Sequence, residues 1–281
     1  MKLTKVAAII TSYNDAEAVL RCVHALKHQV DSITIVDNGS DAEHIPILQS
    51  LRTDESVTVI ESPVNLGVGA ALNLALRSLD IAGIEWVLTM DQDSVVAPDM
   101  VYRMLEAASC YPKASFTPDI SQRERSDGSS APIEVGYAIT SGNLVPIAAL
   151  KILNGLSPTL FIDGVDFDFS LRLRGAGYRI FRVPGARMLH FLGRVDPGKK
   201  PRRFHTIHSP LRRYYMTRNF ILNLRLHGLR FPGFFFRLYV VFFISFMNLL
   251  IFGPKRFESL RMTFRGLLDG ALNRSGAYNR D

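Results

Sequence analysis

Short apolar runs alternate with helix-like segments through the first hundred residues, and this alternation constrains the fold more than any other feature of the chain. Runs typical of buried strands occupy residues 6–11, 32–36, 57–61 and 84–90. Patterns typical of helices occupy residues 15–28 and 68–79. Strands and helices joined by such short links predict βαβ units, and therefore an α/β domain with a Rossmann-like, mostly parallel sheet flanked by helices.

Polar side chains follow three of these expected strands, at the point where each strand ends. They lie in Thr11–Asn14, Asp37–Ser40 and Asp91–Ser94. In open α/β sheets, ligands bind in the crevice outside the carboxyl ends of the strands. The sequence therefore predicts one ligand site at this edge of the sheet.

Composition and charge narrow the classes of function. The 281 residues are 47% hydrophobic and 21% charged, which excludes a disordered or fibrous protein. Two cysteines, Cys22 and Cys110, are too few for a disulfide-rich scaffold or a cysteine zinc site. Residues 1–170 hold 11 basic and 22 acidic side chains, whereas residues 171–281 hold 22 basic and 4 acidic ones. The basic part suits polyanions or acidic lipid headgroups, and the acidic part suits a cation-dependent catalytic domain.

Asp91 and Asp93 are separated by one residue and follow an apolar run. In an extended chain, side chains two residues apart point to the same side, so both carboxylates can reach one hard cation. A pair of this kind also occurs on solvated turns. Its position at a strand end favours a metal site.

Three further carboxylates, Asp163, Asp166 and Asp168, precede a segment that runs on as a helix to Arg174. Acidic side chains at a helix N-terminus complement the helix dipole, which is one reading of this cluster. Apolar residues flank every acid, however, and a partly buried carboxylate is the environment that a general base needs.

Five segments occur in order along the chain: Thr11-Ser-Tyr-Asn14, Ile35-Val-Asp-Asn-Gly-Ser40, Asn65-x-Gly-x-Gly-x-Ala-x-Asn73, Asp91-Gln-Asp93 and Val165-Asp-x-Asp-Phe-Ser-Leu-Arg172. Taken together, they resemble the inverting, family-two nucleotide-sugar glycosyltransferases, which have the GT-A fold. The resemblance covers roughly residues 5–195. The Asp-Gln-Asp-Ser form, Phe161-Ile-Asp-x-Val-Asp166 and Arg213-Tyr-Tyr-x-x-Arg-Asn219 look most like bacterial dTDP-rhamnosyltransferases of O-antigen and capsule synthesis.

This resemblance implies a nucleotide-sugar and metal site. The residues implied in nucleotide-sugar binding are Thr11, Tyr13, Asp37, Asn65, Gly67, Gly69, Asp91 and Gln92. Tyr13 would stack on the base and Asp37 would accept from a base N–H. The implied metal ligands are Asp91, Asp93 and His190, a mixed oxygen and nitrogen set that suits Mg²⁺ or Mn²⁺.

The resemblance also implies the catalytic and acceptor residues. Asp166 aligns with the family's general base and Asp168 with the second acid of that motif. The acid that usually precedes the base is Val165 here, which leaves a choice between the two, and we choose Asp166. The implied reaction is a single in-line displacement, in which the base takes the proton of an acceptor hydroxyl. Acceptor contacts are expected from Ser141, Gly142, Asn143, Arg213 and Arg218.

The C-terminal region is basic and apolar. Between Arg237 and Lys255 lie 17 uncharged residues, mostly Phe, Leu, Val and Ile, whereas a spanning helix needs about 20. Pro232, Gly233 and Asn248 weaken a span further. The approach to this segment is crowded by Arg202, Arg203, Arg212, Arg213, Arg218, Arg225 and Arg230.

We therefore expect residues 1–200 to form the nucleotide-sugar-binding catalytic domain, and residues 201–281 to form a helical region for membrane or acceptor contact. A basic run beside Phe-rich helices suits peripheral attachment to an anionic leaflet. A true span and a dimer or core helix are the alternatives for residues 231–252. The expected location is the cytoplasmic face of a bacterial inner membrane, and the expected acceptor is a lipid-linked saccharide.

Two other functions fit part of the sequence. A transferase of the same fold that uses a UDP-hexose or UDP-N-acetylhexosamine would keep the same motifs. A nucleic-acid-binding protein would account for the pI of about 9.5 and the basic, aromatic C-terminal third. It would leave Asp91, Asp93 and Asp166 without a role, so we expect no nucleic-acid partner. The oligomeric state stays open.

Overall fold

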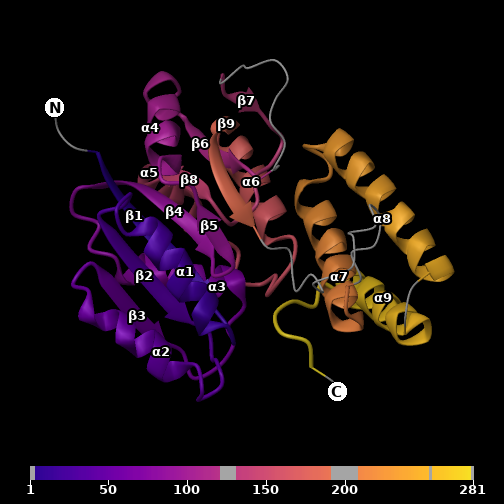
Figure 1. The fold of residues 1–281 in the computed structure, drawn as a ribbon. Helices are drawn as coiled ribbons and strands as arrows, with labels where there is room; N and C mark the ends of the chain where they lie inside the picture. Colours follow the sequence, from indigo (N-terminus) through magenta and orange to yellow (C-terminus); the bar gives the residue numbers. More distant parts are fainter. Residues whose placement is uncertain (1–3, 121–130, 191–207, 253–254, 280–281) are drawn as a thin grey trace.

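A computed structural model describes residues 4–120, 131–190, 208–252 and 255–279. The chain forms an α/β body and, beside it, a group of three helices (Figure 1). The predicted boundary between residues 200 and 201, together with Arg202 and Arg203, lies outside the described residues.

The α/β body carries the strands and the first helices. Its strands are β1 (Lys5–Ser12), β2 (Ser32–Asp37), β3 (Val57–Glu61), β4 (Ile84–Asp91), β5 (Ser94–Val96), β6 (Ala114–Asp119), β7 (Ile133–Glu134), β8 (Asn143–Pro146) and β9 (Arg179–His190). Its helices are α1 (Ala16–Leu26), α2 (Ile45–Ser50), α3 (Val68–Ser78), α4 (Met100–Cys110), α5 (Ile147–Leu153) and α6 (Val165–Gly175), with a 3-10 turn at Leu51–Thr53. The four strands and two helices that the sequence predicts in the first hundred residues are confirmed.

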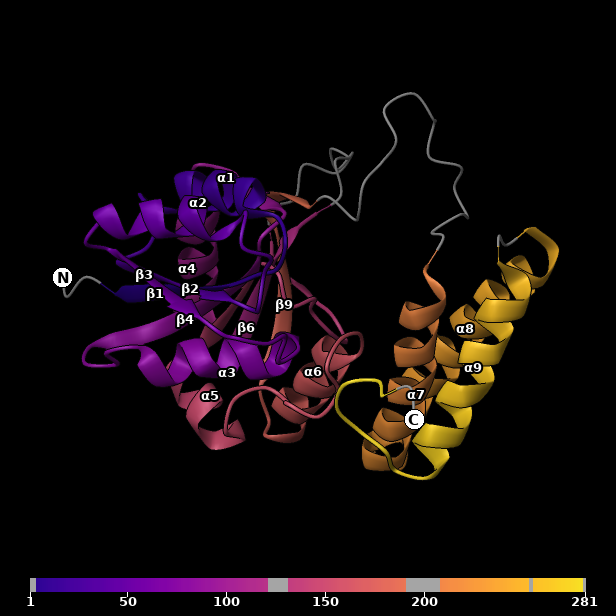
Figure 2. The ribbon, with the colours of Figure 1, turned by 90° about the horizontal axis from the view of Figure 1, so that it is seen from below.

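The sheet has the order β3-β2-β1-β4-β8-β6-β9-β5, with β7 added beside β9. Strands β1 to β4 pair in parallel, β8 pairs antiparallel to β4, and β5 pairs antiparallel to β9. Helices α1, α2 and α4 cover one face, and α3, α5 and α6 cover the other (Figure 2). The predicted α/β fold with a mostly parallel core is thus confirmed.

The register brings the polar strand ends together. Thr11 on β1 pairs with Val36 on one side and with Asp91 on the other, and Ser12 pairs with Asp37. Upstream of these ends, β1 is buried on both faces. Ile10 belongs to the apolar cluster of one face and Ile9 to that of the other, as the period of two in a strand requires. The strand that leads to the predicted ligand site is therefore fixed by packing on both faces of the sheet.

Two glycines at the start of α3 make room for a distant segment, residues 155–164, which leads into α6. A Cβ on Gly67 would lie 2.6 Å from the carbonyl oxygen of Phe161, and a Cβ on Gly69 would lie 2.1 Å from that of Ser157. Later in α3, the Asn73 side chain donates to the Leu156 carbonyl at 2.7 Å and accepts from its N–H at 2.8 Å. The motif Asn65–Asn73 thus packs segment 155–164 against the sheet.

The C-terminal group consists of α7 (Pro210–His227), α8 (Pro232–Phe252) and α9 (Arg256–Ala271). Helices α7 and α9 pack closely, because Gly266 and Gly270 bring α9 against the backbone of Tyr214 and Arg218. Asp269 of α9 accepts a hydrogen bond from the Tyr214 hydroxyl at 2.9 Å. The buried glycine and aspartate positions explain why this pair of helices is one unit.

Helix α8 has 21 residues and begins at Pro232, a position where proline costs little. Among the described residues, it is the one helix long and apolar enough to cross a membrane, with a mean hydropathy of 2.1 over Pro232–Ile251 and only 11% of the span window buried. Phe235 and Leu249 are buried, whereas most of the remaining surface is exposed. This exposure argues against the alternative of a core helix.

We predict that Gly69→Ala destabilises the protein by roughly 1–3 kcal/mol, because its Cβ meets a backbone oxygen that cannot move alone. The matched control is Gly233→Ala, where a Cβ meets nothing within 4 Å. Chemical unfolding followed by circular dichroism measures both variants. Equal stability of Gly69→Ala and wild type would contradict the packing role.

Candidate active site

Two acids and a histidine meet at the carboxyl edge of the sheet. Asp91 ends β4, Asp93 follows it, and His190 ends β9, opposite Ser94 of β5. One ligand atom from each of the three residues lies within 4.8 Å of the others. The predicted metal ligands are thus brought together, although His190 lies far along the chain from Asp91 and Asp93.

The hydroxyls of two buried serines form hydrogen bonds with residues of this trio. Ser94 Oγ lies 2.8 Å from His190 Nδ1 and 2.7 Å from Ser141 Oγ, and Ser141 Oγ accepts from the Asp91 N–H at 3.1 Å. Ser94 and Ser141 are fully buried. Ser94 is not among the predicted site residues, and its one signal in the sequence is its place directly after Asp93. Ser141 is predicted at the acceptor. In the structure Ser141 supports the acidic cluster.

The electrostatics of the trio fit a divalent cation. Asp93 Oδ1 is buried and accepts no hydrogen bond from the described residues, lying 3.5 Å from His190 Nδ1. Burial, reinforced by the Asp93 charge, raises the pKa of Asp91 to about 7. Burial likewise raises the pKa of Asp93. Carboxylates held together without enough positive charge form a site that Mg²⁺ or Mn²⁺ would neutralise.

Gln92 holds the loop after β1. Its Oε1 accepts from the Tyr13 N–H at 2.6 Å, and its Nε2 donates to the Tyr13 carbonyl at 3.1 Å. Tyr13 is 48% exposed, so its ring can stack on a planar ligand. Gln92 therefore orients Tyr13, and the direct contact with a nucleotide sugar expected of Gln92 stays a prediction.

The other implied nucleotide residues line the same edge. Asp37 is buried and accepts from the Ser40 hydroxyl and N–H. Asn65 accepts from the Gly67 N–H at 2.9 Å and from the Asn38 amide at 3.2 Å. Thr11 is adjacent to Asp91 in the sheet. Contacts within the protein explain the residue types at Asn65, Gly67 and Gly69. Their role in lining a nucleotide pocket stays a prediction.

Asp166 and Asp168 differ in their environments. Asp168 is buried, with one oxygen 2.7 Å from Arg172 Nε and the other 2.9 Å from His227 Nε2 of α7. Asp166 forms no ion pair within the described residues and accepts from the Phe167 N–H at 3.0 Å. Burial raises the pKa of Asp166 to about 6, and the charges of Asp163 and Asp91 add to this rise. Asp168 is committed to a structural network, whereas Asp166 is the carboxylate available for proton transfer.

The expected acceptor residues are mostly buried. Gly142 donates its N–H to the Thr89 carbonyl at 2.8 Å, and Asn143 is 2% exposed. Arg218 is 1% exposed and donates to the carbonyl oxygens of Leu160 and Gly276. These contacts give Arg218 a structural role. Arg213 is half-buried at the start of α7, so its acceptor contact stays a prediction.

Arg212 is a site residue that sequence analysis placed only in a basic run. It forms an ion pair with Asp163 at 3.0 Å, and its charge lowers the pKa values of Asp91 and Asp93 against the effect of burial. Arg212 therefore places a positive charge from α7 close enough to act on Asp91 and Asp93. No local motif marks it, because the pairing spans 49 residues.

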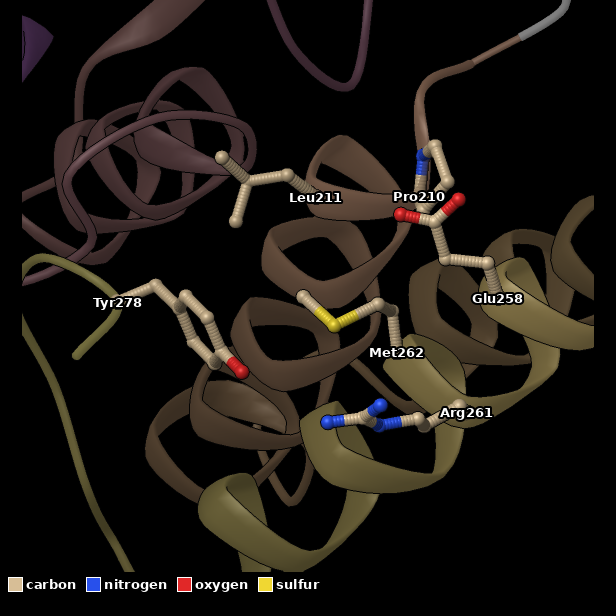
Figure 3. A pocket seen from close by; sticks show the side chains of 6 residues that line it. All are labelled: Pro210, Leu211, Glu258, Arg261, Met262 and Tyr278. Carbon is tan, nitrogen blue, oxygen red and sulfur yellow. The ribbon is translucent and has the colours of Figure 1, made fainter. Parts of the chain in front are cut away.

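A separate hollow of about 360 Å³ lies in the C-terminal group, away from the acidic cluster. Its lining residues are Pro210, Leu211, Glu258, Arg261, Met262 and Tyr278. Met262 of α9 and Tyr278 of the C-terminal tail point toward each other across it (Figure 3). The hollow holds none of the predicted site residues.

Residues 7–143 match the family model described as Glycosyl transferase family 2. They are a glycosyl transferase family 2 domain. Over 304 aligned residues, covering 98% of this chain and 99% of the relative, the chain is 26% identical to dTDP-rhamnosyl transferase RfbF of Shigella flexneri. These matches confirm that the chain is a glycosyltransferase.

Solved structures of other transferases share the fold. A crystal structure of GalNAc-T7 with UDP, GalNAc and Mn²⁺ superposes with a TM-score of 0.68 at 14% identity, over 84% of this transferase and 50% of that chain. A mannosyltransferase from Pyrobaculum calidifontis, in complex with GDP-Man and Mn²⁺, gives 0.61 at 15% identity, over 96% and 76%. The predicted GT-A fold of the transferase is confirmed.

We predict that Asp166→Asn stabilises the metal-free transferase at pH 8. The pKa of Asp166 is raised from 3.8 in the ordinary group to about 6 in the folded state, so folding becomes less favourable as pH rises between these values. Asparagine removes this cost, which is on the order of 1–2 kcal/mol for a partly exposed group. Urea unfolding in the presence of a chelator should show the gain at pH 8 and its loss near pH 4.

Asp168→Asn is the matched control and should have the opposite sign. It leaves Arg172 and His227 without their shared carboxylate, which costs roughly 3 kcal/mol in a buried pair. A gain at pH 8 for Asp168→Asn, or a loss for Asp166→Asn, would reverse the roles assigned to the two acids.

Proposed function

We propose that the transferase moves L-rhamnose from dTDP-L-rhamnose to a hydroxyl of a lipid-linked saccharide, with inversion at the anomeric carbon. The observation that carries this proposal is the cluster of Asp91, Asp93 and His190, together with an Asp166 that the Asp91 charge reaches and that forms no ion pair within the described residues. Similarity over the full length of a dTDP-rhamnosyl transferase supports the choice of donor.

The chain's own residues divide the work. Asp166 takes the proton of the acceptor hydroxyl as that oxygen forms a bond to the anomeric carbon, and the bond to the nucleoside diphosphate breaks. Tyr13 and Asp37 hold the base of the nucleotide. A divalent cation held by Asp91, Asp93 and His190 would supply positive charge for the departing diphosphate. Arg212 adds positive charge nearby, since its field already reaches Asp91.

Thermal stabilisation tests the donor. A ligand that binds only the native state raises the melting temperature, and it does so more the more tightly it binds. If dTDP-rhamnose is the donor, we expect dTDP with Mn²⁺ to raise the melting temperature more than UDP or GDP at equal concentration. Asp93→Asn should abolish the shift that depends on metal. A preference for UDP would point to the UDP-sugar alternative, and stabilisation by oligonucleotides alone would favour a nucleic-acid-binding protein.

Turnover tests the base. A positioned general base contributes roughly 10²–10⁴-fold, so Asp166→Asn should lose that much kcat while keeping the nucleotide affinity of the wild type. Transfer of labelled rhamnose to a lipid-linked acceptor measures kcat, and calorimetry with dTDP and Mn²⁺ measures affinity. Turnover within threefold of wild type would overturn the role of Asp166.

We further propose that α8 attaches the transferase peripherally to the cytoplasmic face of a bacterial inner membrane. Phe236, Val241 and Phe243 are more than half exposed on α8. Exposed basic residues lie on the neighbouring helices, among them Arg256 and Arg261. Apolar side chains beside cationic ones suit the interface of an anionic leaflet.

Vesicle flotation tests this attachment. We expect the triple variant Phe236→Ser, Val241→Ser and Phe243→Ser to bind vesicles containing phosphatidylglycerol at least about tenfold more weakly, since it removes apolar area that the bilayer would bury. The control is Ile152→Ser, which removes an equally exposed apolar side chain from α5. Unchanged flotation of the triple variant would contradict attachment through α8.

A further inference from the structure

The segment that leads to Asp166 has an unusual backbone. Phe161 and Asp163 have φ values of 65° and 62°, and Gly164 has 78°. The left-handed region is unfavourable for residues with a side chain, so such a loop persists only where its surroundings hold it. Gly164 is the N-cap of α6 and provides no side-chain cap. Something outside the loop must therefore fix it.

Asn219 of α7 supplies that hold. Its Nδ2 lies 2.8 Å from the carbonyl oxygens of Leu160 and Ile162, and 2.6 Å from that of Asp163. An amide has two N–H groups, so three carbonyls share two donors. Asn219 is 1% exposed, and water cannot replace these bonds without opening the interface.

Two neighbouring residues of α7 add to these contacts: one orients the Asn219 amide, and the other bonds a further carbonyl of the loop. Arg218 Nε donates to Asn219 Oδ1 at 3.0 Å, which sets the direction in which Nδ2 points. One turn later, Asn223 Nδ2 donates to the Gly164 carbonyl at 3.0 Å. Residues 160–164, the left-handed loop, are therefore bonded to α7 through four carbonyl oxygens, while the Phe161 carbonyl accepts from the Val68 N–H of α3 at 2.7 Å.

We propose that Asn219 is a positioning residue for Asp166: it fixes the left-handed loop and thereby the direction of the first turn of α6. This inference rests on the proposed function, in which Asp166 is the general base. Asp166 lies two residues after Gly164, so a shift of the loop shifts the carboxylate with it. A misplacement of about 1 Å can cost on the order of 10²-fold in rate. The helical region is then part of the catalytic apparatus.

The test uses the full chain and three variants. Asn219→Ala removes both donors, and Asn219→Gln keeps the amide on a side chain one carbon longer. Thr217→Ala is the matched control on α7, since the Thr217 hydroxyl donates to the Arg213 carbonyl of the same helix. We expect both Asn219 variants to lower kcat, by roughly 10- to 100-fold for alanine. We expect the affinity for dTDP with Mn²⁺ to change less than twofold, and Thr217→Ala to match wild type.

Hydrogen exchange gives a readout that does not depend on turnover. Amides of residues 162–168 should exchange faster in Asn219→Ala and Asn219→Gln, whereas those of β1 and β4 should match wild type. Unchanged exchange in 162–168, or faster exchange with kcat intact, would overturn the positioning role. A wild type that binds no nucleotide diphosphate would instead overturn the proposed function, and the exchange comparison would still decide whether Asn219 holds the loop. An Asn219→Ala chain that fails to fold leaves the decision to Asn219→Gln.

Discussion

The structure depends on how segment 155–164 is held, because this segment packs against α3 and leads into α6, the helix that carries Asp166. On one side it packs against α3, where Gly67 and Gly69 leave room for its backbone. On the other side α7 donates to its carbonyl oxygens through Asn219. The C-terminal tail adds a third contact, from the Gly276 N–H to the Thr159 carbonyl at 2.6 Å. A segment bonded on three sides can keep a strained conformation.

The second constraint is electrostatic. Burial raises the pKa values of Asp91, Asp93 and Asp166; the Asp93 charge adds to the rise at Asp91, and the Asp91 charge adds to the rise at Asp166. Arg212 offsets part of the rise at Asp91 and Asp93. A folded site with excess negative charge is stabilised when a cation binds or when one of its carboxylates takes up a proton. This explains why one edge combines serine supports, acids and a histidine. Under the proposed function, the same edge would serve metal binding, diphosphate binding and proton transfer.

The elements of the first hundred residues could be predicted because local periodicity and strand-end polarity encode them. Other features depend on contacts that no local pattern reveals. Gly69 looks like part of a nucleotide loop, yet its partner Ser157 lies far along the chain. Asp168 looks as catalytic as Asp166 until His227 is seen beside it. Arg218 looks like an acceptor contact, but folding buries it against Leu160.

The most direct test of the central claim is a crystal structure of the transferase with Mn²⁺ and dTDP. We expect anomalous density for manganese between Asp93 and His190, the thymine ring on Tyr13, and Asp166 facing the side from which an acceptor would approach. Nucleotide bound instead in the hollow beside Arg261 and Tyr278, or manganese held by other residues, would contradict it.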